Sequence, residues 1–237
     1  MNEFWDEEIT KGYYDKVILD GLSNGRSIQA NWHNITFNKV SNRIKKNIKH
    51  LDYACGPGTL IGRYTQANSV GIDIAQKQIE YANENFSNKG KFYTISHFEK
   101  EKYVNYFDVI TIMGLFEFLK DDEIIDLLND LHSQLGDNGK LISTTLNFQT
   151  ALNFILFFLN KFSENNYSDQ HINKFDMSRI EKLLLRTKFS NIEVKKFMTF
   201  GVFFSIISNS FGKKINKLLE KFFSNNFGFL LLIELKK

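Results

Sequence analysis

The sequence of 237 residues contains a single cysteine, Cys55, and a single proline, Pro57. A lone cysteine cannot close a disulfide within the chain, which excludes a disulfide-stabilised framework and favours a reducing compartment. Long hydrophobic runs are missing too, since the apolar stretches near 151–159 and 202–207 are much shorter than the roughly 18 residues of a membrane-spanning helix. Because the acidic start at residues 1–8 does not look like a signal peptide, we expect a cytoplasmic protein.

A large excess of either charge is also missing. The net charge is +3, and 24% of the residues are charged. Lysines are scattered, with short pairs such as Lys45 and Lys46 or Lys213 and Lys214, which is typical of solvated faces rather than of a nucleic-acid groove. No cluster of His, Cys and Asp has the spacing of a metal site, so no metal is expected. A chain of 237 residues with 43% hydrophobic residues suits one large α/β domain.

The most informative stretch is a turn with the frame Asp52-x-Ala54-x-Gly56-x-Gly58, which follows an apolar segment. A glycine-rich turn between a strand and a helix leaves backbone N–H groups available to a ligand and allows close approach to the main chain. Further along, Asp73 ends a short apolar segment. In doubly wound α/β folds an acid at this place, about 20 residues on, accepts hydrogen bonds from a ribose diol. The two features together predict a site for a nucleoside-containing cofactor.

The frame of this turn resembles the first motif of the class I S-adenosylmethionine-dependent methyltransferases, Asp/Glu-x-Gly-x-Gly-x-Gly. Three later segments are similar to the family's fourth strand, the loop after it, and its fifth strand with the preceding turn: Phe107–Met113, Gly114–Leu119 and Leu131–Ile142. The resemblance covers about residues 45–145 well and the tail of the chain loosely. It points to the members of the family that act on small molecules.

The resemblance implies S-adenosylmethionine as cofactor, with the turn around its methionine portion and Asp73 at its ribose hydroxyls. The cofactor-binding residues expected on this basis are Asp52, Ala54, Gly56, Gly58, Asp73, Ile74, His97 and Met113. Ala54 stands where the family has its first glycine, and we expect the turn to survive because alanine is small. Phe118 stands where the family often has histidine, which argues against catalysis there. We expect Gly58→Val to abolish cofactor binding in a folded chain, because the side chain would occupy the cofactor's space.

Strand-like and helix-like segments alternate, as a parallel sheet requires. The strands are expected at about 48–54, 69–73, 91–95, 107–113, 139–145, 191–198 and 227–235, and the helices at about 27–48, 59 onward, 75–86, 121–135 and 176–188. This order resembles the family's α/β fold, a Rossmann-like doubly wound sheet of seven strands with the last strand antiparallel. We expect a single methyltransferase domain over 1–237. Its parts would be an N-terminal helical cap (1–47), a cofactor-binding core (48–145), and two substrate-side inserts that include a helical lid (146–175 and 199–225).

Both inserts are rich in phenylalanine. They either pack on the sheet or form an apolar substrate pocket or a membrane-surface contact. Ligands of open α/β sheets bind beyond the carboxyl ends of the strands. We therefore expect the substrate between the N-terminal segment, the loop after Met113, and the first insert. The substrate-binding candidates in these segments are Tyr13, Tyr14, Trp32 and Phe154.

Methyl transfer requires an aligned acceptor, exclusion of water and, for a hydroxyl acceptor, a general base. Among the five histidines we select His171, just before the helix that borders the substrate cleft, with a structural or capping role as the alternative. His97 is placed near the adenine. His50 is expected ahead of the first strand, at the far end of the sheet, and His132 on the surface. Cys55 is expected to pack as a small residue within the turn.

Three functions remain open from the sequence. The first is a methyltransferase acting on a small molecule, such as an apolar, quinone-like or envelope-precursor metabolite. The second is an RNA or protein methyltransferase, although the weak basic clustering disfavours RNA. The third is a non-catalytic binding module, although the intact Asp52, Gly56, Gly58 and Asp73 argue against it. The sequence indicates neither the methylated atom nor the oligomeric state.

Overall fold

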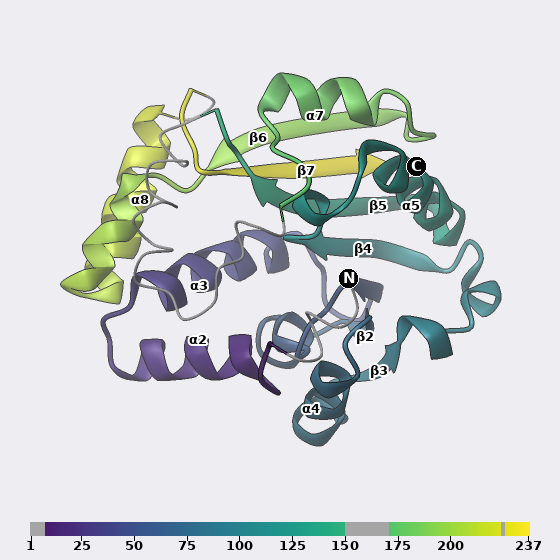
Figure 1. The fold of residues 1–237 in the computed structure, drawn as a ribbon, viewed down its shortest axis with the longest axis horizontal. Helices are drawn as coiled ribbons and strands as arrows, with labels where there is room; N and C mark the ends of the chain where they lie inside the picture. The colour runs from purple at the N-terminus through teal and green to yellow at the C-terminus, as the bar shows by residue number, and fades with distance from the viewer. Residues whose placement is uncertain (1–7, 150–170, 224–225) are drawn as a thin grey trace.

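The computed structural model describes residues 8–149, 171–223 and 226–237. Seven strands form one sheet in the order β3-β2-β1-β4-β5-β7-β6 (Figure 1). Their bounds are β1 (Lys49–Tyr53), β2 (Asn68–Asp73), β3 (Gly90–Thr94), β4 (Phe107–Met113), β5 (Leu135–Leu146), β6 (Asn191–Phe197) and β7 (Leu230–Lys236). β7 runs antiparallel to both of its neighbours, and the other neighbouring pairs are parallel. The predicted doubly wound sheet with an antiparallel last strand is confirmed.

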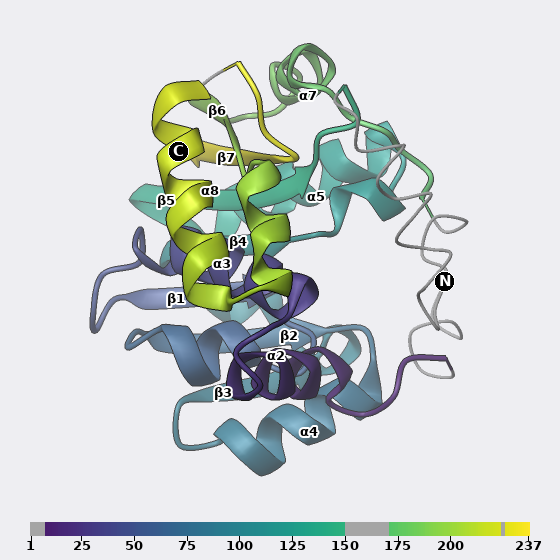
Figure 2. The same cartoon turned by 90° about the vertical axis from the view of Figure 1, so that its left-hand side faces the viewer.

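Helices cover both faces of this sheet (Figure 2). The α-helices are α2 (Tyr13–Ser23), α3 (Ile28–Ser41), α4 (Gln76–Phe86), α5 (Asp121–Gln134), α7 (Met177–Leu184) and α8 (Asn209–Phe223). Shorter turns are the π-helical η1 (Leu60–Tyr64) and the 3₁₀ turns η2 (Ile95–His97), η3 (Lys100–Tyr103), η4 (Phe116–Phe118) and η6 (Phe200–Ile206). One core cluster joins α5 and α7 to the sheet, and a second joins α3 and the residues around η6 to it. A sheet covered on both faces explains why its central strands β1 and β4 are buried over most of their length.

The carboxyl ends of β1, β2, β4 and β5 meet at one edge of the sheet, because these strands are parallel to their neighbours in this group. β7 runs the other way and therefore begins at this edge, where Leu230 lies opposite Leu146. The segment between β6 and β7, which contains α8, emerges at the same edge. Figure 1 shows α2, α3 and α8 gathered beyond it, on the left of the view. We call this the carboxyl edge.

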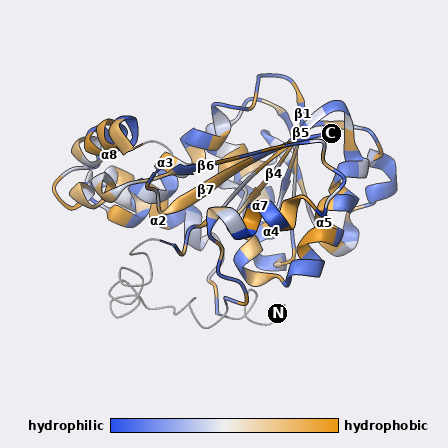
Figure 3. Cartoon of the chain, turned by 90° about the horizontal axis from the view of Figure 1, so that it is seen from above, coloured by the Kyte–Doolittle hydropathy of each residue, from blue (hydrophilic) through white to orange (hydrophobic). Residues whose placement is uncertain are grey.

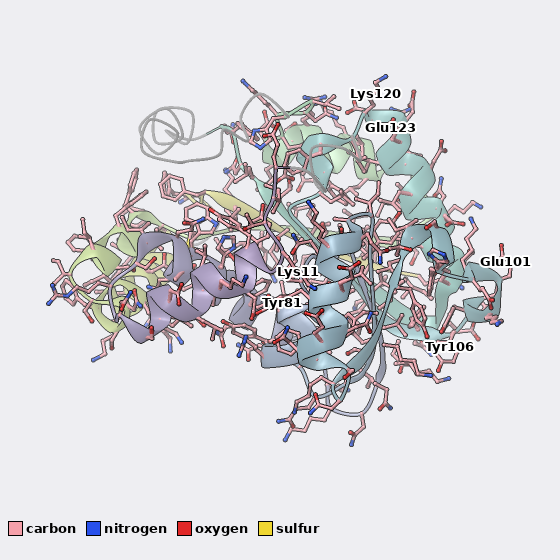
Figure 4. All side chains as sticks on the ribbon, turned by 60° about the horizontal axis from the view of Figure 1, so that its bottom comes forward. Lys11, Tyr81, Glu101, Tyr106, Lys120 and Glu123 are labelled. Atoms are coloured by element: carbon pink, nitrogen blue, oxygen red, sulfur yellow. The ribbon has the colours of Figure 1, made fainter. Side chains whose placement is uncertain are left out.

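A buried ion pair ties α2 to the body of the domain. Asp15, which is fully buried, accepts hydrogen bonds from Arg63 Nε at 2.7 Å and Nη2 at 2.8 Å, and from the Tyr81 hydroxyl at 2.9 Å. Lys11 reaches Glu84 of α4 at 2.6 Å (Figure 4, where Lys11 and Tyr81 are labelled). These contacts link α2 to η1 and α4, and so position the N-terminal segment beside the cofactor half of the sheet.

Several expectations about individual elements were wrong. Helical structure does begin at Thr59 as expected, but it is the short π-helical turn η1 rather than a longer α-helix, and Gly62 within it weakens an α-helix. The helix expected at 27–48 ends at Ser41, and α2 precedes it as a separate helix. His50 lies inside β1 rather than ahead of it.

The two inserts differ in what the structure describes of them. Most of the first, including Phe154, lies outside the described residues. The second contains η6 and α8, a helix that the sequence analysis did not predict. Within the described parts of the chain, no helix has both the length and the apolarity to cross a membrane.

Candidate active site

The turn after β1 depends on left-handed backbone conformations. Ala54, Gly56 and Gly58 have φ angles of 59°, 52° and 74°. Glycine adopts such angles freely, whereas an alanine incurs a cost of roughly 1–2 kcal/mol. The turn nevertheless keeps its shape with Ala54 in the place of the family's first glycine. The glycine preference at this position therefore reflects backbone conformation as well as side-chain size.

Gly56 and Gly58 face opposite environments. A Cβ placed on Gly56 would meet no atom within 4 Å, whereas one on Gly58 would lie 2.7 Å from Phe92 Cε1 and 3.0 Å from Ala82 Cβ. The reason given for the expected effect of Gly58→Val was therefore wrong, because the added side chain would enter the core rather than the cofactor's space. Gly56 is the position at which the turn is open to a ligand.

Asp73 connects the turn to the start of α4. Its Oδ2 accepts a hydrogen bond from Gly56 N at 2.8 Å, and its Oδ1 accepts one from Ala75 N at 2.9 Å. An ionised carboxylate has about four acceptor positions, so these contacts are compatible with a ribose diol as a further donor. The next residue, Ile74, is 39% exposed and offers apolar surface beside the carboxylate.

Asp52 is a buried carboxyl group at this edge with a strongly raised pKa. Only 1% of it is exposed, and its Oδ1 accepts a hydrogen bond from the Thr111 hydroxyl at 2.6 Å. Its Oδ2 is buried with no hydrogen-bond partner. Burial, opposed by the Thr111 hydrogen bond and assisted by the nearby Asp73 charge, raises the pKa of Asp52 to about 7. A buried acceptor without a partner fits a ligand that carries a cationic donor, such as the amino group of an amino acid.

A series of buried hydrogen bonds leads from Asp52 into the sheet. The Thr111 hydroxyl gives its proton to Asp52, so His50 Nε2, at 2.9 Å, is assigned as the donor to Thr111. His50 Nδ1 then accepts from the Ser69 hydroxyl at 3.0 Å. Burial lowers the pKa of His50 to about 3, so this ring stays neutral at physiological pH. His50 therefore supports the site from inside the sheet, and both of its ring nitrogens are engaged by buried residues.

The remaining cofactor candidates follow the next strands of the same edge. His97 belongs to η2 after β3, is exposed, and bonds through Nδ1 to the Thr94 hydroxyl at 2.6 Å. Thr94 in turn pairs with Asp73 in the sheet register. Met113 is the half-buried last residue of β4. All eight predicted cofactor residues thus lie near the carboxyl ends of β1 to β4 or in the segments that follow them.

Glu117 is a site residue that the sequence analysis missed. It follows β4, is 4% exposed, and accepts a hydrogen bond from the Thr145 hydroxyl at 2.8 Å. Burial raises its pKa to about 7, against the opposing effect of its hydrogen bonds. Its Oε1 lies 3.8 Å from where a Cβ on Gly114 would stand, so the carboxyl group reaches the turn after β4. The available signal was a lone acid between Phe116 and Phe118, directly after a buried strand.

His171 lies against the same loop. The carbonyl oxygen of Glu117 accepts hydrogen bonds from Ile172 N at 2.8 Å and Asn173 N at 3.0 Å. The His171 ring contacts Phe118, with centroids 5.2 Å apart, and is half-buried. Burial, and then the charge of Lys174, lower the pKa of His171, which favours the neutral ring. The structure therefore brings a neutral imidazole to the loop that carries the Glu117 carboxyl group.

Three of the aromatic candidates, Tyr13, Tyr14 and Trp32, lie on the N-terminal helices. Tyr13 and Tyr14 open α2 with ring centroids 5.2 Å apart, and Tyr14 also contacts His33 of α3 at 5.8 Å. Trp32 stacks on Phe229 with centroids 6.0 Å apart. The second core cluster also includes two partly buried residues from this edge, Met113 and Phe148, and Phe148 contacts His171 at 5.8 Å. Trp32, Met113 and His171 are thus joined through shared neighbours.

The chain matches a known protein family. A family model described as a methyltransferase domain matches residues 29–194, which is more than half of the chain. The chain belongs to the methyltransferase-domain family, and the prediction of a class I S-adenosylmethionine-dependent methyltransferase is confirmed. No curated protein matches the chain significantly. The Asp52 acceptor without a partner and the open face of Gly56 fit the cofactor of this class.

Solved structures share the fold at low sequence identity. The plantazolicin methyltransferase BpumL in complex with SAH has a TM-score of 0.60 and 20% identity, over 100% of this chain and 93% of that chain. Magnesium protoporphyrin IX methyltransferase (ChlM) from Synechocystis PCC 6803, with bound SAH, has a TM-score of 0.58 and 16% identity, over 98% and 100%. A SAM-dependent methyltransferase from Archaeoglobus fulgidus has a TM-score of 0.56 and 18% identity, over 85% and 94%. These likenesses extend over nearly whole chains and concern the fold.

Proposed function

We propose that the protein transfers a methyl group from S-adenosylmethionine to a small-molecule acceptor with substantial apolar surface, such as a quinone-like or envelope-precursor metabolite. The observation that carries the proposal is the buried Asp52 oxygen that has no hydrogen-bond partner. It lies four residues before Gly56, the position at which the turn is open to a ligand. A fold alone does not establish catalysis. This acceptor position supports a cofactor that carries a cationic group.

Different residues at the carboxyl edge would bind different parts of the cofactor. S-adenosylmethionine supplies a methyl group that its sulfonium has already activated. Asp52 would hold the amino group of its methionine part and Asp73 its ribose hydroxyls, while Ile74 and His97 would lie on the adenine side. The burial of Asp52 strengthens such a contact, because charges interact more strongly where water is excluded.

The acceptor would lie between Trp32, Met113, the loop that carries Glu117, and His171, which packs against that loop. These neighbours are largely aromatic or apolar, which favours a ligand with a flat apolar part. A hydroxyl acceptor would give its proton to the neutral His171 ring, and Glu117 would hold the backbone of residues 172–173 in place. Two of the proteins with similar solved structures are named as methyltransferases of plantazolicin and of magnesium protoporphyrin IX. Acceptors of these kinds fit the proposal.

The test begins with binding and ends with the acceptor. The purified protein should bind S-adenosylhomocysteine by calorimetry, and Asp73→Ala should weaken this binding by roughly 1.5–3 kcal/mol, the usual range for hydrogen bonds to a charged group. Cell extract incubated with protein and methyl-labelled S-adenosylmethionine should then yield label in the small-molecule fraction.

Three outcomes would contradict the proposal in different ways. Absence of S-adenosylhomocysteine binding would remove the cofactor. Label in RNA or protein only would replace the acceptor class. Binding without transfer to any fraction would favour the non-catalytic module. Asp52→Asn serves as the matched control, because it keeps the shape of the side chain and should lose the labelling.

A further inference from the structure

The apolar stripe of α8 faces solvent. Phe211, Ile215, Leu218 and Phe222 recur at the spacing that places side chains along one side of a helix. Phe211 is 41% exposed, Leu218 50% and Phe222 72%. On an ordinary surface helix such a stripe packs against the core, so this arrangement is inverted.

A neighbouring side of α8, about a quarter turn from the stripe, packs against the domain through small and polar groups. Gly212 and Asn216 are its buried residues. A Cβ on Gly212 would lie 2.2 Å from Ser205 Oγ, and one on Gly201 would lie 2.3 Å from Asn216 N, so the two segments touch at backbone distance. Asn216 Oδ1 accepts hydrogen bonds from Thr199 N at 2.7 Å and from the Thr199 hydroxyl at 2.9 Å. These contacts fix the rotation of the helix, and the outward stripe follows from them.

The exposed apolar surface continues onto η6. Phe204 is 43% exposed, and its ring contacts Phe211 with centroids 5.6 Å apart. Ile206 and Ile207 are 68% and 58% exposed. Figure 3 shows α8 at the outer end of the molecule, away from the sheet, with hydrophobic ribbon along it. We call the surface formed by Phe204, Ile206, Ile207, Phe211, Leu218 and Phe222 the α8 face.

A row of lysines borders this face. The exposed lysines of α8 are Lys213, Lys214, Lys217 and Lys221. None of them forms a salt bridge within the described part of the chain. The one acid of the helix, Glu220, turns inward instead, to Lys39 Nζ at 2.7 Å and to Met198 N at 2.9 Å. Lys217 and Lys221 also line an open groove of about 470 Å³ with Lys39, Arg43, Lys195 and Lys196. Three cations of this groove, Lys39, Arg43 and Lys195, pair with Glu220, Glu234 and Glu193, so the excess positive charge on the flank of the α8 face comes mainly from the lysines of α8.

We propose that the α8 face docks onto the surface of a membrane that contains anionic lipids. Phenylalanine and leucine on one side of a helix and lysine on the other are the composition of helices that lie in the lipid interface. The apolar side chains would enter the boundary between headgroups and acyl chains, and the lysines would meet anionic headgroups. A second copy fits less well, because pairing through this face would bring two lysine rows together without acids between them. The docked face adjoins the carboxyl edge, where the acceptor site opens.

The experiment measures co-sedimentation of the whole chain with vesicles of phosphatidylcholine alone and of phosphatidylcholine with phosphatidylglycerol. Binding should require phosphatidylglycerol and should fall as salt is added. Leu218→Ser/Phe222→Ser should lose at least tenfold of this binding, because it removes two exposed side chains that would enter the lipid. Lys214→Gln/Lys221→Gln should lose about 30-fold, from the contribution of each lysine near an anionic surface.

Matched controls remove the same residue types elsewhere. Val104→Ser/Leu185→Ser removes exposed apolar side chains, and Lys89→Gln/Lys91→Gln removes exposed lysines, and both should bind vesicles as the wild type does. Every variant should keep the wild-type melting temperature. Failure of the wild type to bind vesicles with phosphatidylglycerol would overturn the proposal. Equal losses in the α8 variants and their controls would overturn it too. A third result would also overturn the proposal. In it, ultracentrifugation shows a wild-type dimer that does not bind vesicles and that Leu218→Ser/Phe222→Ser dissociates.

Discussion

Thr111 on β4 donates its hydroxyl proton to Asp52 on β1 across 2.6 Å, and the two residues are direct partners in the sheet register. One oxygen of the Asp52 carboxyl group is therefore held by the neighbouring strand, and the other is presented without a partner. The acceptor position of the proposed cofactor site is thus set by the sheet rather than by the turn. Because the strand cannot shift without breaking the ladder, this position is rigid before any ligand arrives.

The first prediction concerns the pH dependence of cofactor binding. Since burial raises the pKa of Asp52 to about 7, the carboxyl group is protonated below that pH and cannot pair with a cation. The affinity for S-adenosylhomocysteine should rise about tenfold per pH unit from about pH 5 and level off above pH 7. Calorimetry across this range with Asp52→Asn should give a flat profile. Glu117→Gln should keep the slope, and a slope retained in Asp52→Asn would contradict the assignment.

The second prediction separates the two glycines of the turn. Gly58→Ala should destabilise the protein by about 2–4 kcal/mol, because it adds the strain of a left-handed alanine to a clash with Phe92. Gly56→Ala should cost only the backbone term of roughly 1–2 kcal/mol, and should weaken S-adenosylhomocysteine binding. Urea denaturation and calorimetry on both variants measure the two effects. Equal losses of stability in the two variants would contradict the finding that Gly58 packs against Phe92 while Gly56 is open.

The third prediction concerns the ion pair that anchors α2. Arg63→Leu leaves the buried Asp15 without its cation, and the loss of a partner in a buried pair typically costs 3–5 kcal/mol. Since the Arg63 side chain is 32% exposed, we expect a smaller loss than this range, about 2–3 kcal/mol by urea denaturation. Lys100→Ala in the exposed pair with Asp130 is the control and should change stability by less than about 1 kcal/mol. A loss no larger than that of the control would show that Asp15 does not depend on Arg63.

The fourth prediction concerns the stability of the ligand-free protein. The folded-state pKa values of Asp52 and Glu117 are both raised to about 7, so the folded state binds more protons than the unfolded state between about pH 4 and pH 7. The contribution of these groups to stability is therefore present below about pH 4 and is lost as pH rises through 7. The double variant Asp52→Asn/Glu117→Gln should flatten this part of the pH profile of the melting temperature. An unchanged profile would show that neither group titrates in this window.

The fifth prediction tests the general base. If His171 accepts the proton of the acceptor, His171→Ala should lower turnover by roughly 10²–10⁴-fold and leave the affinity for S-adenosylmethionine nearly unchanged. A structural role would instead lower the melting temperature and preserve activity per folded molecule. Both quantities are to be measured on one preparation. Full turnover in a folded variant would exclude His171 as the base.

Much of the sheet could be predicted from the sequence, because β2, β4 and β7 are short, mainly apolar segments, and β2 and β4 end at an acid and before a glycine. The cofactor edge followed from the frame around Gly56 and from Asp73, since both are local features. The environment of Gly58 could not be predicted, because the clash involves Phe92 on a strand reached through a long crossover. Glu117 was missed because its burial comes from Thr145 on another strand and not from its own neighbours in sequence.

The orientation of α8 could not be predicted for a different reason. Its apolar spacing indicates a helix whose stripe faces the core, and the sequence gives no sign that Gly212 and Asn216 occupy that side instead. The close backbone contact with Gly201 decides the rotation. Close packing of Gly201 against Asn216 and of Gly212 against Ser205 therefore outweighs the apolar pattern at this helix.

The antiparallel last strand affects the order in which the protein can be assembled. β7 lies between β5 and β6, although it follows both in the chain. While the polypeptide is still being synthesised, β5 has an open edge and β6 has no partner until residues 230–236 leave the ribosome. Exposed strand edges are prone to incorrect pairing. The carboxyl-terminal half of the sheet, together with α8 between β6 and β7, can therefore close only after translation has passed its last strand, and truncation within β7 would remove two ladders at once.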